Sequence, residues 1–260
     1  MTTTPGCVVI TGASSGFGAE FARRFAAAGA DVILVARRLD RLGVLAEELS
    51  SAHGVRAVPI EADLALPGAA ERLVREIDAR GMNPDGLVNN AGFGIDGPLA
   101  TADIADVSGL LQVNVVALTE LSVLLLPRLL AHESAVLVNV ASTASFQPLP
   151  HLALYGASKA YVRTLTEALW KEAQGTGLKV LALCPGPTET EFFQVAGSER
   201  FKVGQMLTVP QVIDHAFDAL GQRRAGPTRV AGWRNRVTAL APRLVPTRTA
   251  LAVAGSLTKD

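Results

Sequence analysis

The stretch TGASSGFG, from Thr11 to Gly18, follows the apolar run at residues 7–11 and opens a helical pattern at residues 16–28. Its glycines at 12, 16 and 18 allow the backbone to approach a ligand closely, and the start of a helix presents N–H groups that no carbonyl of its own helix accepts. A glycine-rich turn alone is weak evidence, but here the strand before it and the helix after it are both present. The stretch therefore predicts a site for the pyrophosphate of a dinucleotide.

Apolar runs alternate with helical patterns along most of the chain. The expected strands are residues 7–11, 31–36, 55–60, 86–90, 135–140, 178–184 and a short one at 229–231. The expected helices are residues 16–28, 39–52, 68–80, 103–130, 152–174 and 210–221. Such an order indicates a parallel sheet with helices on both faces, and right-handed crossovers make it doubly wound. We predict one α/β Rossmann-type domain of about seven strands over residues 1–231.

Composition narrows the class of protein. The 260 residues are 49% hydrophobic and 18% charged, with a net charge of zero, which argues against a nucleic-acid binder. Polar residues interrupt the most apolar stretch, 107–130, so we expect no membrane span, and the first residues have no signal-peptide pattern. Two cysteines, Cys7 and Cys184, lie in expected strands and indicate neither a disulfide framework nor a metal site. We expect a cytoplasmic protein.

The end of the second expected strand indicates which dinucleotide binds. An NAD site usually has an acidic residue there, which binds the ribose 2′-hydroxyl. This chain has Arg37 and Arg38 instead, and Asp40 fits better at the start of the next helix. Guanidinium groups suit a 2′-phosphate, so NADP(H) is favoured. The alternative is that both arginines are solvated loop residues.

Tyr155 and Lys159 are four residues apart in an expected helix, and Ser142 ends the fifth expected strand. Residues at i and i+4 share a helix face. A cation ~4 Å from the tyrosine hydroxyl contributes on the order of 4 kcal/mol at an effective dielectric of ~20, which would lower its pKa of about 10 by up to about 3. The pair is thus a candidate acid for carbonyl chemistry. An isolated pair of this kind is more often a surface feature.

The motifs together resemble the short-chain dehydrogenase/reductase family, of the NADP(H)-preferring type, over roughly residues 6–230. They occur in the family's order: TGASSGFG at 11–18, NNAG at 89–92, Asn114, Ser142, YGASK at 155–159 and PGPTET at 185–190. The resemblance implies that Tyr155 is the general acid/base, that Lys159 binds the nicotinamide ribose, that Ser142 polarises the carbonyl and that Asn114 holds a proton-relaying water.

The resemblance also implies a set of cofactor-binding residues. Asp63 would contact adenine, and residues 89–92 would support the cofactor, although Asn89 could instead tie neighbouring strands together. The expected set is Gly12, Ser14, Ser15, Gly16, Phe17, Gly18, Arg37, Arg38, Asp63, Leu64, Asn90, Ala91, Gly92, Tyr155, Lys159, Pro185, Gly186, Thr188 and Thr190. No metal is expected. The alternative function, a catalytically idle dinucleotide-binding regulator, is disfavoured because no member of the catalytic set is missing.

The connection at residues 191–209 is long for such a fold, and long connections at this edge of a sheet are usually functional. We expect it to form a lid over the substrate. Its apolar residues and those facing it from elsewhere are Phe192, Phe193, Val195, Phe201, Met206 and Leu207, with Phe93, Ile95, Phe146 and Leu152. They favour a lipophilic ketone or aldehyde, or the matching alcohol, as the substrate. The alternative is that they only pack the lid against the body.

Residues 232–260 form a basic, apolar C-terminal extension whose only acidic residue is Asp260. Packing on the fold or on a partner is favoured over contact with an anionic membrane surface, because Pro242 and Pro246 interrupt any long helix. The family resemblance implies a homodimer or homotetramer, paired through the helices expected at 103–130 and 152–174.

Overall fold

The computed structural model describes residues 5–191, 204–222 and 225–257. Within these residues, seven strands form a single parallel sheet in the order β3-β2-β1-β4-β5-β6-β7. The strands are β1 (Cys7–Thr11), β2 (Asp31–Ala36), β3 (Ala57–Glu61), β4 (Gly86–Asn89), β5 (Ala135–Val140), β6 (Leu178–Cys184) and β7 (Thr228–Val230). The predicted doubly wound fold is confirmed, including the short seventh strand.

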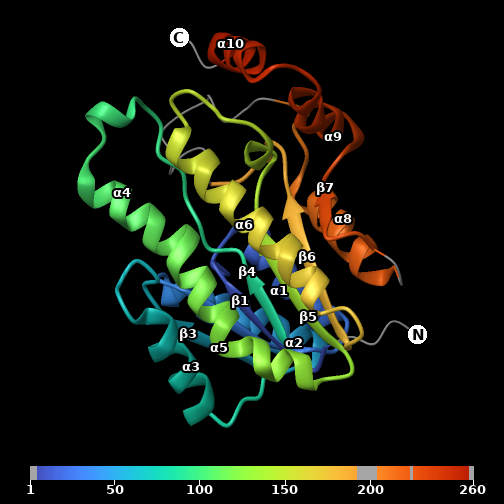
Figure 1. Cartoon of the computed structure of the whole chain (residues 1–260). Helices are drawn as coiled ribbons and strands as arrows, with labels where there is room; N and C mark the ends of the chain where they lie inside the picture. The colour runs from blue at the N-terminus through green and yellow to red at the C-terminus, as the bar shows by residue number, and fades with distance from the viewer. Residues whose placement is uncertain (1–4, 192–203, 223–224, 258–260) are drawn as a thin grey trace.

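Helices cover both faces of the sheet (Figure 1). They are α1 (Gly16–Ala27), α2 (Leu39–His53), α3 (Ala69–Ala79), α4 (Ile104–Leu111), α5 (Leu118–Ala131), α6 (Ala153–Glu172), α8 (Val209–Gly221), α9 (Trp233–Leu240) and α10 (Thr247–Leu257). Three short 3₁₀ turns accompany them: η1 (Leu99–Thr101), η3 (Thr143–Phe146) and η4 (Ala241–Leu244). Both α9 and α10, red in Figure 1, lie beyond the end of the sheet towards which the strands point.

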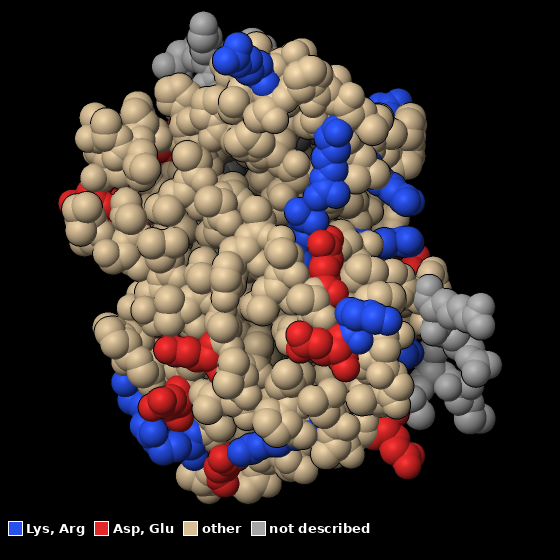
Figure 2. All heavy atoms as spheres, viewed as in Figure 1, with Lys and Arg blue, Asp and Glu red and all other residues tan. Residues whose placement is uncertain are grey.

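The helix expected at residues 103–130 is not a uniform α-helix. A π-helical segment, η2 (Gln112–Ala117), separates α4 from α5. The whole run, Ile104–Ala131, is by length and composition apolar enough to cross a membrane, with a mean hydropathy of 1.8 over its most apolar window, which the polar interruptions did not lead us to expect. On the inner side of α5, Leu121, Leu125 and Leu129 are nevertheless fully buried against the sheet, and 39% of the apolar window is buried. Figure 2 shows few charged side chains on the outer face over α4, α5 and α6.

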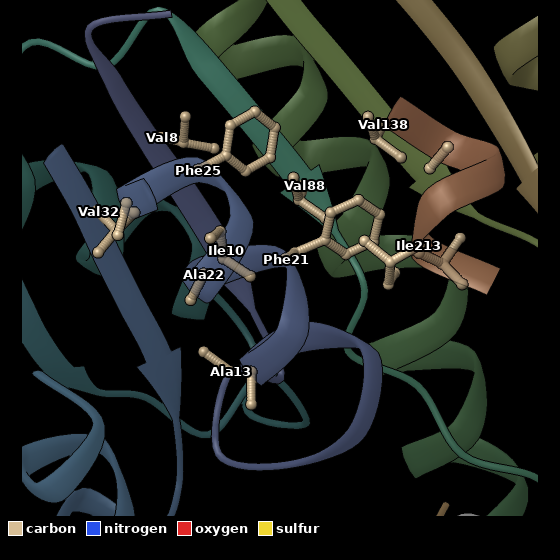
Figure 3. Packing of buried hydrophobic residues seen from close by; sticks show 14 of the residues in the cluster. Val8, Ile10, Ala13, Phe21, Ala22, Phe25, Val32, Val88, Val138 and Ile213 are labelled. Atoms are coloured by element: carbon tan, nitrogen blue, oxygen red, sulfur yellow. The ribbon is translucent and has the colours of Figure 1, made fainter. Parts of the chain in front are cut away.

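The core is divided into two layers by the alternation of side chains along each strand. Val8 and Ile10 of β1 point into the layer with α1, α2 and α8, whereas Val9 belongs to the layer with α3 and α5. Figure 3 shows the first layer, where Phe21 and Phe25 of α1 pack on the strands. Each is at most 2% exposed, and full burial of such a side chain stabilises the fold by about 1.5–3 kcal/mol.

The strand order reverses direction between β1 and β4, because β2 and β3 lie on one side of β1 and the later strands lie on the other. In open parallel sheets, ligands bind outside the carboxyl ends of the strands at such a point. The segments that follow β1 and β4 are the glycine-rich turn at 11–18 and the NNAG motif at 89–92. The topology therefore brings these two motifs together at one edge.

Candidate active site

The glycine-rich turn connects β1 to α1 with a backbone that other residues would strain. Gly12 and Gly16 have φ angles of +66° and +53°, and a β-carbon at Gly18 would collide with the carbonyl oxygen of Gly12. The N-cap residue Ser15 makes no side-chain hydrogen bond to α1, and the first turn of α1 has no acidic residue. The turn therefore leaves the first N–H groups of α1 as donors for a phosphate.

One cleft of about 840 Å³ joins this turn to the other predicted motifs. It runs from the end of β2 across the carboxyl edge of the sheet to α6 and the C-terminal helices. The predicted residues that line it are Gly12, Ser14, Ser15, Phe17, Arg37, Arg38, Asp63, Leu64, Asn90, Ala91, Gly92, Ser142, Tyr155, Lys159, Pro185, Gly186, Thr188 and Thr190. The other three predicted residues do not line this cleft. Asn114 is buried next to it, Gly16 lines an adjoining hollow, and Gly18 packs against the backbone of Gly12 within the turn.

At the β2 end of the cleft, Arg38 is held by the turn. Its guanidinium donates to Ser14 Oγ at 2.9 Å and to Ser15 Oγ at 3.0 Å. It also donates to the carboxylate of Glu191 at 2.9 Å, and Arg41 donates to the other oxygen at 2.7 Å. These two guanidinium groups hold the pKa of Glu191 down at about 2, with hydrogen bonds from Arg41 and then Arg38 as the main causes. Arg37 is exposed at the same end of the cleft.

This ion-pair cluster contains two residues that the sequence did not single out, Arg41 and Glu191. Arg41 lies in the first turn of α2, three residues after Arg38, which is the N-cap residue of that helix. That proximity in sequence was a usable signal for Arg41. Glu191 is 153 residues from Arg38, so no local pattern could indicate the pair. Asp40 is exposed in the first turn of α2, as expected of a residue at a helix start.

The segments after β3 and β4 complete the side of the cleft where the sequence predicts that a dinucleotide binds. Asp63 accepts a hydrogen bond from the backbone N–H of Ala65 at 3.0 Å, so its side chain shapes a local turn. The amide of Asn90 donates to the carbonyl of Thr11 at 2.8 Å, which ties the end of β4 to the glycine-rich turn. Asn89 is buried and donates to Asn139 Oδ1 on β5 at 2.9 Å. Asn89 thus joins neighbouring strands, the alternative that the sequence left open.

The end of the cleft that contains the predicted catalytic residues is called the reacting end below. It is formed by the end of β5 and the start of α6. Ser142 follows β5, and its Oγ accepts a hydrogen bond from Ala144 N at 3.1 Å. Tyr155 and Lys159 lie one turn apart on α6 and are 7% and 4% exposed. Lys159 Nζ donates to the carbonyl of Val140 at 2.8 Å. The three predicted side chains therefore meet on one wall of the cleft.

Burial controls the protonation of the Tyr155–Lys159 pair. It raises the pKa of Tyr155 to about 12, although a hydrogen bond with Ser142 opposes the shift. It lowers the pKa of Lys159 to about 8. The expected decrease in the tyrosine pKa beside a cation ~4 Å away is wrong for this geometry. Lys159 Nζ is 6.0 Å from the centre of the Tyr155 ring and is bound to the Val140 carbonyl, so loss of solvation outweighs its field.

Asn114 lies in the π-helical segment η2 and is fully buried. Its Oδ1 accepts from Phe93 N at 3.1 Å, and its Nδ2 donates to Phe93 O at 2.9 Å and to Ser158 Oγ at 3.2 Å. A β-carbon at Gly92 would lie 3.0 Å from Asn114 Oδ1 and 3.2 Å from Lys159 Nζ. The missing side chain at 92 thus lets the amide and the ammonium group approach the same point.

The segment after β6 closes the far side of the reacting end. The carbonyl of Pro185 accepts from Thr143 N at 2.8 Å, which fixes its distance from Ser142. Thr188 is buried, and its hydroxyl donates to the carbonyl of Gly186 at 3.0 Å. A β-carbon at Gly186 would collide with the side chain of Asn235, so α9 begins directly against this segment.

The predicted apolar wall is only partly present among the described residues. Phe192, Phe193, Val195 and Phe201 lie outside them. Phe93, Ile95 and Leu152 line the cleft, as does Leu149, but the expectations for Phe146, Met206 and Leu207 are wrong: none of the three lines it. Phe146 packs between two guanidinium groups, Met206 is exposed and Leu207 is buried in the core. Thr238, Ala239 and Ala254 line the cleft in their place and were missed.

The fold and the cleft define a dinucleotide-binding α/β protein, and comparison with known proteins names its family. Residues 6–200 match the family model for short chain dehydrogenases. The chain belongs to the short-chain dehydrogenase family, which consists of oxidoreductases that bind a nicotinamide dinucleotide and small-molecule substrates and that often form oligomers. The resemblance seen in the motifs is confirmed.

Three relatives illustrate the range of the similarity. Sulfoacetaldehyde reductase 2 of Chromohalobacter salexigens is 40% identical over 187 residues, 71% of this chain and 73% of that protein. A solved 7β-hydroxysteroid dehydrogenase superposes with a TM-score of 0.85 at 27% identity, over 96% of each chain. A short-chain dehydrogenase from Sphingobium yanoikuyae in complex with NADPH superposes with a TM-score of 0.80 at 30% identity, over 98% of this chain and 95% of that one.

The residues of the cleft fit a nicotinamide dinucleotide. The close approach at Gly18 and the donors at the start of α1 suit its pyrophosphate, and the side chains of Ser142, Tyr155 and Lys159 suit its reactive end. Among the described residues, no group of three or more His, Cys, Asp or Glu side chains lies close enough to hold a metal ion.

Proposed function

We propose that the protein is an NADP(H)-dependent oxidoreductase that interconverts an apolar ketone or aldehyde and its alcohol. The observation that carries this proposal is a single cleft that joins the glycine-rich turn and Arg38 at one end to Ser142, Tyr155 and Lys159 at the other. The bound cofactor would supply a hydride to the carbonyl carbon, or accept one in the reverse direction.

Tyr155 would act as the general acid for reduction. Its pKa of about 12 keeps the hydroxyl protonated at neutral pH, so it can donate a proton to the carbonyl oxygen as negative charge develops there. Ser142, which follows β5 on the same wall, would donate a second hydrogen bond to that oxygen. Lys159 would bind the ribose hydroxyls and, below its pKa of about 8, supply a positive charge beside the tyrosine.

Asn114 would support this chemistry from behind the wall. Its amide is fixed by Phe93 and Ser158 and is brought close to Lys159 Nζ at Gly92. A water held at that point could pass a proton to the lysine, the role that the family resemblance implies. Pro185, Gly186, Thr188 and Thr190 would shape the nicotinamide site on the opposite side.

The preference for NADP(H) rests on the β2 end of the cleft. Arg38 already binds a carboxylate there, together with Arg41, so the same guanidinium groups can bind the 2′-phosphate. The position after β2 where an NAD site has its acidic residue is occupied by arginine. The related structure that contains NADPH supports the same choice.

The lining of the reacting end favours an uncharged, apolar substrate. Phe93, Ile95, Leu149 and Leu152 are among its described residues. Lys159 is the only basic side chain among the described residues that line this end, and it is engaged with the Val140 carbonyl. Among these described residues, Lys159 alone could pair with a sulfonate such as that of sulfoacetaldehyde, whereas the steroid named for the 7β-hydroxysteroid dehydrogenase is the kind of ligand that their apolar side chains suit.

We also propose that the enzyme is cytoplasmic and assembles as a homodimer or homotetramer. The outer face of α4 to α6 supports an assembly, since Ile104, Val123 and Tyr161 are 77%, 64% and 41% exposed there. Burial of such a patch between two copies would remove apolar area from water. Light scattering on the purified protein would contradict this proposal if it gave the mass of one chain.

The function is tested by titrating the protein with NADPH and NADH while following nicotinamide fluorescence, and then by assaying reduction of cyclohexanone, acetophenone and benzophenone. We expect NADPH to bind at least about tenfold more tightly than NADH, since hydrogen bonds to a charged group contribute about 1.5–3 kcal/mol. We also expect turnover with at least two of the ketones. Tighter binding of NADH would overturn the cofactor assignment, and reduction of sulfoacetaldehyde alone would overturn the substrate class.

A further inference from the structure

The C-terminal extension, here residues 232–257, forms part of the cleft at its reacting end. Thr238 and Ala239 of α9 and Ala254 of α10 line the same cleft as Ser142 and Tyr155. Ala239 and Ala254 are each only 3% exposed, which shows that these positions of the two helices face the body of the protein. In Figure 1, both helices lie across the end of the sheet towards which the strands point.

The start of the extension is anchored beside the nicotinamide side of the cleft. Asn235 is 1% exposed and accepts from Gln205 N at 2.7 Å. Its Nδ2 donates to the carbonyls of Gln205 at 3.0 Å and Ala231 at 3.1 Å. The side chain of Asn235 lies so close to Gly186 that a β-carbon at position 186 would collide with it. The start of α9 is thus in contact with the segment after β6. The position of α9 is therefore fixed relative to the reacting groups.

A second anchor joins the extension to the turn that follows Ser142. The guanidinium carbon of Arg243 lies 5.1 Å from the centre of the Phe146 ring, and that of Arg163 lies 4.8 Å from it. Arg163 belongs to α6, the helix of Tyr155, and donates to Glu167 at 2.8 Å. The extension is thus linked to both elements that carry the proposed catalytic residues.

We propose that the C-terminal extension is the size-selecting wall of the substrate site, with Ala254 as a specificity-determining residue. Methyl side chains at 239 and 254 leave space in the cleft that a larger residue would fill. The ligand class is a carbonyl compound with a bulky, uncharged group on the side of the carbonyl that faces α10. This inference rests on the proposed reduction of ketones and adds the part of the chain that selects among them.

Three variants test the proposal. Ala254→Leu adds bulk to the cleft, and Ala254→Gly removes it. Ala252→Leu is the matched control, because Ala252 lies on the same helix but is exposed. For each protein, kcat/KM is measured with NADPH for cyclohexanone, acetophenone and benzophenone. The dissociation constant for NADPH is measured by fluorescence, and thermal melting is recorded to compare the folds.

We expect Ala254→Leu to lower kcat/KM for the bulkiest ketone that is reduced at least about tenfold more than for the smallest, because packing differences in an apolar pocket are of that size. Ala254→Gly should shift the same ratio the other way, and Ala252→Leu should leave it unchanged. NADPH binding should be the same in all four proteins. Equal ratios for Ala254→Leu and Ala252→Leu would overturn the inference while leaving the proposed function intact. Lack of reduction of every ketone by the wild-type protein would overturn both.

Discussion

The two ends of the cleft are built on different physical principles. At the β2 end, Arg38, Arg41 and Glu191 have side chains that are 40%, 46% and 38% exposed, and their attraction is screened by water. At the reacting end, Tyr155 and Lys159 are almost completely buried. Burial raises the pKa of the tyrosine and lowers that of the lysine, so it favours the neutral form of each side chain. The difference teaches that the first end can exchange one anion for another at small cost, whereas the second depends on groups that water cannot replace.

The comparison predicts the largest effect for a change at the buried end. Tyr155→Phe removes the proposed proton donor and leaves the ring in place, so kcat for ketone reduction should fall by about 10²–10⁴-fold. The dissociation constant for NADPH should change little. Tyr161→Phe is the matched control, because Tyr161 is 41% exposed and its hydroxyl interacts with Thr119. Steady-state kinetics with both variants would refute the assignment if Tyr155→Phe kept the wild-type kcat.

A smaller effect is expected at the exposed end. Arg38→Ala removes a guanidinium group that would bind the 2′-phosphate, and such charge-assisted bonds contribute about 1.5–3 kcal/mol, or about 10–100-fold in affinity. Fluorescence titration should show weaker NADPH binding and unchanged NADH binding. Arg23→Ala serves as the control, since Arg23 pairs with Glu48 on the outer surface. Equal losses for the two cofactors would mean that Arg38 supports the turn through Ser14 and Ser15 instead.

The pH dependence of reduction sharpens the same contrast. Burial lowers the pKa of Lys159 to about 8, so its ammonium group is present below pH 8 and is lost as the pH rises through that value. If the cation is required, kcat/KM should be constant below about pH 8 and fall about tenfold for each further pH unit. Tyr155, with a pKa of about 12, adds no loss in that range. A rate that stays constant up to pH 10 would contradict a role for the charged lysine.

The smallest predicted effect concerns Glu191, whose carboxylate occupies the guanidinium groups that the phosphate would use. An exposed ion pair contributes about 0.2–1 kcal/mol, so Glu191→Gln should tighten NADPH binding by about 1.4- to fivefold and leave NADH binding unchanged. Glu189→Gln is the control, because Glu189 is exposed two residues earlier. Weaker NADPH binding in Glu191→Gln would show that the carboxylate positions the arginines and does not compete with the phosphate.

Most of the sheet and its cofactor edge could be predicted because their signals are local. The strands at 7–11, 31–36 and 178–184 were placed with the observed bounds, since continuous apolar runs end at glycine, proline or polar residues. The glycine-rich turn was recognisable because backbone conformation and close approach restrict its residue types. The third strand was placed two residues early at its start, at 55 in place of Ala57.

The parts that escaped prediction depend on contacts between distant segments. The π-helical segment at 112–117 has the apolar pattern of an ordinary helix, so its wider backbone turn is not visible in the sequence. Ala239 and Ala254 carry no chemistry that a sequence pattern could reveal, and their place in the cleft follows from the packing of the extension. The prediction of a lowered pKa for Tyr155 was wrong in direction. Burial of the hydroxyl raises this pKa more than the nearby lysine lowers it, and burial cannot be seen in the spacing of two residues.

The π-helical segment also changes the rotational position of α5 about the helix axis relative to α4. Each residue of an α-helix turns the chain by about 100°, so a wider turn acts like one inserted residue between two regular helices. The face of α5 that carries Leu121, Leu125 and Leu129 is thereby offset from that of α4. Loss of one residue here would restore a regular helix, yet it would rotate either Asn114 away from Phe93 or the leucines away from the sheet. The wider turn of this helix therefore positions both the amide of Asn114 behind the cleft and the leucines of α5 in the core.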